Sequence, residues 1–195
     1  MLVVAASLAG ASCAQAPAPP AGNDRVKPSY DVQTGRLERI TYDRNGDGRV
    51  DATTFMDGSA VVRAELDENF DGTIDRWEHY ATEASAESPA SGGAAGGVLR
   101  RVEIATRADG TVSRWEIYEG GSLRRVEEDT SGDGRVDKWE TWERGSLQVV
   151  ALDTKGTGTA DRRLVYSVDG QPRLEVDLNG TGTVTPAAAA SSTPR

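Results

Sequence analysis

A short repeat constrains the fold of this chain more than any other feature. Glycine-containing acidic segments related to the pattern DxNxDGxxD begin at Asp43, Asp67, Asp129, Asp153 and Asp177. The starts are evenly spaced except for the long step from Asp67 to Asp129, and a sixth copy, "ATRADGTVSRWE" from Ala105, divides that step. What remains of the step matches the low-complexity insert "EASAESPASGGAAGG" at 83–97. A period of about 24 residues is typical of arrays whose units pack on their neighbours. We therefore expect one repeat domain over residues 30–185 with a flexible loop at 83–97.

The stretch between two consecutive loops is too short for a pair of helices. If each loop takes about 12 residues, as an EF-hand loop does, only about half of the period remains before the next loop. A glycine turn such as "ERGS" or "EGGS" divides that remainder again. Each half is too short for a helix that is stable in water, and it suits a strand of about six residues. In the second copy alone, the stretch "WEHYATEASAE" also fits a helix that runs into the insert.

The residues before each loop alternate between apolar and polar, which indicates a strand with one buried face. The apolar pairs are Ile40 and Tyr42, Ala64 and Leu66, Val102 and Ile104, Val150 and Leu152, and Leu174 and Val176. Glu128 interrupts the alternation in the fourth copy. Hydrophobic residues make up 37% of the chain, which is too little for a thick core. We therefore predict an all-β fold, an antiparallel meander of about six hairpin repeats in a single elongated sheet.

Two resemblances accompany this pattern. The order of tryptophan, tyrosine, glycine and leucine in each hairpin ("W..Y..G.L") resembles bacterial MORN-like hairpin repeats over residues 30–180. The loops resemble the EF-hand calcium loop, which has oxygen-bearing side chains at positions 1, 3, 5 and 9, glycine at 6 and glutamate at 12. In "DENFDGTIDRWE", which starts at Asp67, every one of these positions is filled. The helices that flank an EF-hand loop do not fit between these loops.

Calcium takes six to eight oxygen ligands, some of them from backbone carbonyls or water. We number the loops one to six from Asp43, Asp67, Ala105, Asp129, Asp153 and Asp177, and count positions from these residues. The candidate ligands are Asp43, Asn45, Asp47, the Arg49 carbonyl and Asp51 in loop one; Asp67, Asn69, Asp71, the Thr73 carbonyl, Asp75 and Glu78 in loop two; and Asp129, Ser131, Asp133, the Arg135 carbonyl, Asp137 and Glu140 in loop four. Loops three, five and six have lost ligands but keep the glycine at position 6.

The same loops can be interpreted as turns without an ion. Asp, Asn and Gly are common in turns because they tolerate left-handed backbone and cap neighbouring amides. Glu116 stands at position 12 of loop three, which lacks the other ligands, so these glutamates could be strand residues in every copy. Against a plain turn, three or four carboxylates within one short loop repel one another unless a cation lies among them.

The aromatic residues suggest a second kind of site. Trp77, Trp115, Trp139 and Trp142, with Tyr80 and Tyr118, recur at related positions and could form an exposed row that binds a glycan or a protein. The alternative, which we favour, is that they supply the core. Residues three apart in a strand point to opposite faces, so Trp139 and Trp142 cannot both be buried by a single-layer sheet.

The N-terminus has the features of an export signal. Residues 1–12 are an apolar run too short to span a bilayer, as in a signal peptide. The sequence "LAGAS" before Cys13 resembles the lipobox of bacterial lipoproteins, which implies a lipid on Cys13 and attachment to a membrane of the bacterial cell envelope. An ordinary cleaved signal is the alternative. Residues 13–29 are expected to be a Pro/Ala-rich tether, and residues 186–195 a disordered tail.

Composition argues against several functions. The formal charge of −9 makes nucleic acid an unsuitable partner. The only histidine, His79, lies beside Trp77 and Tyr80 without a recognisable catalytic partner, so we expect no enzyme activity. The sequence predicts an exported, lipid-anchored calcium-binding repeat protein that interacts with an unidentified envelope protein or glycan. The alternative is a metal-independent binding module that uses its aromatics.

Overall fold

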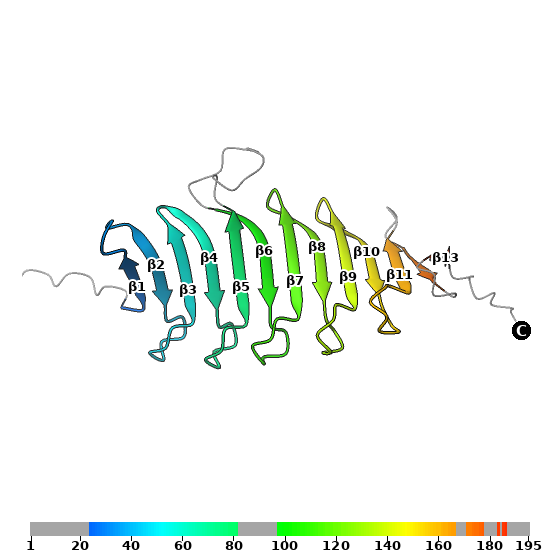
Figure 1. The fold of residues 1–195 in the computed structure, drawn as a ribbon, viewed down its shortest axis with the longest axis horizontal. Helices are drawn as coiled ribbons and strands as arrows, with labels where there is room; N and C mark the ends of the chain where they lie inside the picture. Colours follow the sequence, from blue (N-terminus) through cyan, green and yellow to red (C-terminus); the bar gives the residue numbers. More distant parts are fainter. Residues whose placement is uncertain (1–23, 82–96, 167–170, 178–182, 184, 187–195) are drawn as a thin grey trace, which may run out of the picture.

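The computed structural model describes residues 24–81, 97–166, 171–177, 183 and 185–186, which form one open antiparallel sheet of 13 strands (Figure 1). Every strand pairs with the strands that precede and follow it in the chain, which confirms the predicted all-β meander. The strands are β1 (Val26–Tyr30), β2 (Leu37–Tyr42), β3 (Ala52–Asp57), β4 (Ala60–Leu66), β5 (Arg76–Ala81), β6 (Val98–Ile104), β7 (Arg114–Glu119), β8 (Ser122–Glu128), β9 (Lys138–Glu143), β10 (Ser146–Leu152), β11 (Arg162–Tyr166), β12 (Pro172–Val176) and β13 (Thr185–Pro186).

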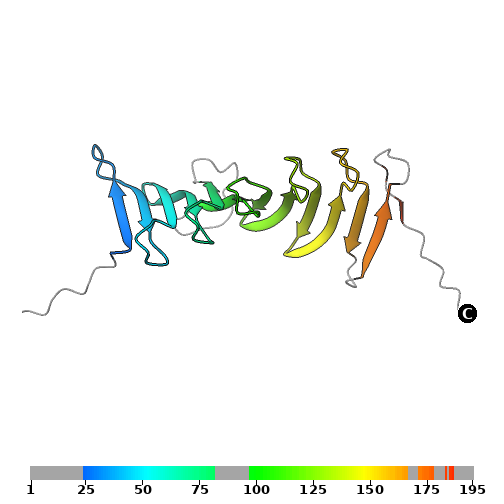
Figure 2. The same ribbon diagram turned by 90° about the horizontal axis from the view of Figure 1, so that it is seen from below.

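The two kinds of connection lie on opposite edges of the sheet. Figure 1 shows the acidic loops at one end of the strands, and this side of the sheet is here called the loop edge. The short hairpin turns lie at the other end of the strands. In the view of Figure 2 the sheet is a thin, twisted layer. The described part of the chain contains no helix long and apolar enough to cross a membrane.

The register of the strands defines two faces, because successive side chains of a strand point to opposite sides. One face, here called the valine face, has a central row of directly paired residues: Ala64, Glu78, Val102, Glu116, Val126, Glu140 and Val150. The opposite face, here called the tryptophan face, has the row Glu65, Trp77, Glu103, Trp115, Glu127, Trp139 and Ala151.

The core lies on the valine face and is very small. Among the described residues only Ala64, Val102, Ala105 and Val126 are buried apolar residues. The predicted alternation therefore gives buried side chains at the centre of the sheet, whereas Tyr42 and Leu174 near its ends are exposed. A strand near the end of a single layer has fewer neighbouring strands to cover its side chains.

Five of the strand pairs have a bulge at the end opposite the acidic loops. The register shifts near Tyr30, Met56, Tyr80, Tyr118 and Leu147, where one strand has an extra residue. The turn between β7 and β8 consists of Gly120 and Gly121, both with positive φ, the signature of the type I′ turns that match strand twist.

The structure differs from two expected boundaries, and from one alternative for the second copy. The sheet begins at Val26 rather than at residue 30, because the end of the predicted tether pairs with β2 as β1. The chain at Arg76–Ala81 is a strand, not the start of a helix. Pro186, assigned to the tail, belongs to β13. The predicted signal peptide, Cys13, the tether up to residue 23, residues 83–96 of the insert and residues 187–195 of the tail lie outside the described residues.

Candidate functional site: the acidic loops

The bases of consecutive loops are joined along the loop edge. The position 1 amide of one loop donates to the position 9 carbonyl of the loop before it. These bonds run from Asp67 to Asp51 at 2.7 Å and from Asp129 to Ser113 at 2.8 Å. The pattern recurs at each of the other described junctions between loops. Strand pairing therefore continues into the loop bases, so each loop has a fixed position relative to the next one.

The carboxylate at position 1 accepts hydrogen bonds from backbone amides of its own loop. Asp67 accepts hydrogen bonds from the amides of Phe70 and Gly72, at positions 4 and 6, with distances of 2.6 and 2.8 Å. Asp43 and Asp129 make the same two contacts. The position 6 glycines have φ between +71° and +93° in all five described loops, a region that disfavours other residues. Every described loop therefore makes the same turn at position 6.

The residue at position 9 closes the loop from the other side. Asp51 is only 2% exposed and accepts the amides of Arg44 and Asn45 at 2.7 and 3.1 Å. In loop three the hydroxyl of Ser113 takes this place and accepts the Thr106 amide at 3.1 Å. Position 9 is therefore a buried acceptor even in a loop that has lost the acidic pattern.

Positions 3 and 5 are exposed, and each side chain accepts at most one backbone amide. The Asn69 side chain accepts the Asp71 amide at 2.9 Å, and the Asp71 carboxylate accepts the Thr73 amide at 2.8 Å. Asp47 and Asp133 make the same kind of contact. A carboxylate has about four acceptor sites, so these side chains keep capacity for an external ligand.

Hydrogen bonds within each loop thus hold the loop together without an ion, as the turn interpretation requires. No three His, Cys, Asp or Glu side chains in the described parts of the chain converge on a point that could hold a metal. Loop five keeps only Asp153 and Asp161 from the acidic pattern, yet Asp153 still accepts the Gly158 amide at 2.5 Å. Positions 1 and 9, which are buried or half-buried, therefore stabilise the fold of each loop, whereas the exposed positions 3 and 5 distinguish loops one, two and four.

The glutamates at position 12 are not brought to their loops, which corrects the expectation for Glu78 and Glu140. They lie on the valine face in the middle of β5 and β9, where the alternation of a strand directs them. Glu78 accepts hydrogen bonds from Arg76 at 2.9 Å and from the Tyr80 hydroxyl.

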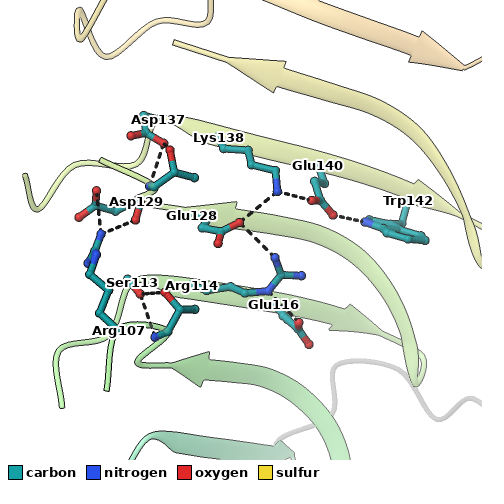
Figure 3. Close-up of polar contacts among 12 residues, drawn as sticks. Arg107, Ser113, Arg114, Glu116, Glu128, Asp129, Asp137, Lys138, Glu140 and Trp142 are labelled. Carbon is teal, nitrogen blue, oxygen red and sulfur yellow. Dashed lines mark hydrogen bonds and ion pairs between the residues drawn. The ribbon is translucent and has the colours of Figure 1, made fainter. Parts of the chain in front are cut away.

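Glu116 and Glu140 repeat this arrangement along the valine face. Glu116 accepts hydrogen bonds from Arg114 and from the Tyr118 hydroxyl. Glu140 accepts hydrogen bonds from Lys138 at 2.9 Å and from Trp142 Nε1 at 3.0 Å (Figure 3). The sequence already indicated that these glutamates could be strand residues, because Glu116 follows loop three, which lacks the other ligands. We therefore assign all three glutamates to the sheet.

Glu128 joins these groups into a network that the sequence did not reveal. Its carboxylate lies 3.2 Å from Arg114 Nη1 and 3.1 Å from Lys138 Nζ, so it bridges β7 and β9 (Figure 3). Although burial opposes the charged form, the carboxylates of Glu140 and Glu128 raise the pKa of Lys138. The residue that interrupts the apolar alternation is thus paired with a cation on each neighbouring strand.

The phenols in these groups give a pH prediction. Burial and the hydrogen bond to a neighbouring glutamate raise the pKa of Tyr80 and of Tyr118 to about 12. Since the raised pKa favours the neutral phenol in the fold, this contribution to stability is complete below about pH 10 and is lost as the pH rises through about 12.

An absorbance titration of tyrosinate tests this expectation. The Glu116→Gln variant should lower the pKa of Tyr118 and leave that of Tyr80 unchanged, because only Tyr118 donates to Glu116. Equal movement of both phenols, or of neither, would contradict the assignment.

The six aromatic residues do not form one row, which corrects the predicted aromatic face. Trp77, Trp115 and Trp139 lie on the tryptophan face, whereas Tyr80, Tyr118 and Trp142 bond to glutamates on the valine face. Residues three apart in a strand point to opposite sides, as expected for Trp139 and Trp142. All six are half-buried.

Comparison with known proteins adds no assignment. No protein-family model matches the chain, and no curated protein matches its sequence.

Proposed function

We propose that this chain is an exported, lipid-anchored calcium-binding repeat protein with a structural or surface-interaction role. The observation that carries the proposal is the charge of loop two. Asp67, Asp71 and Asp75 belong to one short segment, and the ion pairs within the described part of the chain include none of the three. Their mutual repulsion is relieved when a cation binds.

The donor set suits calcium. Each of loops one, two and four supplies side-chain oxygens at positions 1, 3, 5 and 9, together with the position 7 carbonyl of Arg49, Thr73 or Arg135. Without the position 12 glutamate, water completes the six to eight ligands that calcium takes. Such sites suit the dissociation constants of about 0.1–1 mM that extracellular modules have. At the tight end of this range, about 1 mM calcium would stabilise the fold by about 1.4 kcal/mol for each site.

The ion would reinforce a structure with little core. Calcium would link the two ends of a loop, and the loop bases are hydrogen-bonded to one another along the sheet. The sheet would then be rigid where calcium is abundant, outside the cytoplasm. In this proposal Cys13 carries the lipid that holds the protein on a bacterial envelope membrane, and a mass spectrum of the mature protein that shows an unmodified Cys13 would contradict it.

Calorimetric titration of the full chain with calcium tests the proposal. We expect heat from two or three sites, and Asp71→Asn, Asp47→Asn and Asp133→Asn should each remove one. Asparagine can still accept the amide two residues further on, so the loop fold is preserved. The matched control is Asp109→Asn in loop three, where Asp109 accepts the Thr111 amide at 2.8 Å without the other ligands.

A titration without heat at millimolar calcium would overturn the calcium proposal. The alternative would then be a metal-independent module. The observation in its favour is the row of Trp77, Trp115 and Trp139 on a face that no second layer of the described chain covers, at every second strand of the sheet. Tryptophan emission in the presence of glycan or protein partners would be the next measurement.

A further inference from the structure

A basic residue of loop three reaches across to loop four. Arg107 Nη2 donates to the Asp129 carbonyl at 2.6 Å and lies 3.4 Å from the Asp129 carboxylate Oδ1 (Figure 3). Arg107 occupies position 3 of loop three, where loops one, two and four have Asn45, Asn69 and Ser131. Arg107 therefore replaces a candidate ligand of loop three, and its guanidinium contacts Asp129, the first candidate ligand of loop four.

The same contact recurs where position 3 is basic again. In loop five Lys155 stands at position 3, and its Nζ lies 3.4 Å from the carbonyl of Asp177, the first residue of loop six. Loops one and four have the neutral Asn45 and Ser131 at position 3, and among the described residues the next first ligands, Asp67 and Asp153, form no ion pair. Loops two and four, which share a donor set, therefore differ in their counter-charge.

The guanidinium has a fitted place in loop four. A Cβ at Gly132 would lie 3.3 Å from Nε, Cζ and Nη2 of Arg107, so the glycine at position 4 leaves room for it. The Asp129 side chain is 5% exposed and that of Arg107 is 32% exposed, so the pair is partly shielded from water. Shielding strengthens an ion pair relative to one on the open surface.

We propose that Arg107 is a built-in counter-cation of loop four, which holds Asp129 in the ion-free protein and weakens calcium binding there, so that loop two fills before loop four. The calcium part of this inference rests on the proposed function. An oxygen that already accepts from a guanidinium is a poorer calcium ligand, because the ion must displace the arginine or share the carboxylate with it. A mixed array of this kind would respond to calcium in two steps.

The test uses the full chain with Asp47→Asn and Asp71→Asn, so that loop four is the remaining site. Adding Arg107→Gln should tighten its calcium affinity about three- to tenfold, the range of a partly shielded ion pair. Arg107→Lys keeps the charge but loses the planar guanidinium. Its calcium affinity should therefore lie between that of the chain with Arg107 and that of Arg107→Gln. The control is Arg144→Gln, which removes the same charge in the turn between β9 and β10, on the edge opposite the loops.

A second measurement needs no calcium. In a chelator, Arg107→Gln should lower the thermal midpoint relative to Arg144→Gln, because Asp129 loses its counter-charge. If Arg107→Gln and Arg144→Gln change the loop-four affinity equally while the intact chain still binds calcium, the role of Arg107 is wrong and the proposed function stands. Absence of calcium binding in every variant would overturn both.

Discussion

Val126→Asp is expected to destabilise the sheet by about 3–5 kcal/mol, the scale of an uncompensated buried charge. Val126 is 1% exposed at the centre of the valine face. Its direct neighbours are Glu116 on β7 and Glu140 on β9. An aspartate there would lose its water and face a carboxylate on each side. A typical domain is stable by about 5–15 kcal/mol, so the variant would be largely unfolded in mild denaturant.

Two further substitutions separate packing from charge. Val126→Ala removes two methyl groups and should cost about 2 kcal/mol. Val126→Lys also buries a charge, but its amine can extend between the carboxylates of Glu116 and Glu140 or reach solvent along its apolar stem. Urea unfolding followed by circular dichroism should therefore rank stability as alanine, then lysine, then aspartate. Equal losses for lysine and aspartate would show that the neighbouring glutamates do not matter.

Asp51→Ala is expected to cost about 1–3 kcal/mol in calcium-free buffer, the penalty for leaving buried partners of a hydrogen bond unsatisfied. The Asp51 carboxylate accepts the amides of Arg44 and Asn45 and is almost completely buried. Without it, the entry into loop one has no acceptor on that side. Thermal unfolding in a chelator measures this effect without any contribution from a bound ion.

The chain contains its own control for this prediction. Ser113 stands at position 9 of loop three, is fully buried and accepts an amide through its hydroxyl. Asp51→Ser should therefore recover a large part of the stability that Asp51→Ala loses. Asp47→Ala, at exposed position 5, should unfold near the wild-type temperature. A loss for Asp47→Ala as large as that for Asp51→Ala would mean that the loop fold does not depend on the buried position.

The sequence alone determined the features that depend on neighbours along the chain. The regular period, the short strands and the glycine turns excluded helical hairpins and predicted the meander, because each hairpin is built from local contacts. The opposite orientation of Trp139 and Trp142 also followed from the period of two. The loss of ligands before Glu116 already indicated that the position 12 glutamates need not belong to the loops.

The tertiary structure decided everything that depends on residues from neighbouring strands and loops. Only pairing across strands showed that Glu128 bridges Arg114 and Lys138, and that Val126 lies between two glutamates. Only the order of the loops along the loop edge showed that Arg107 contacts Asp129, which is distant in sequence. The strand register and the order of the loops bring together residues that are distant in sequence. The sequence shows how the carboxylates are spaced, but it does not show which basic side chain pairs with each of them.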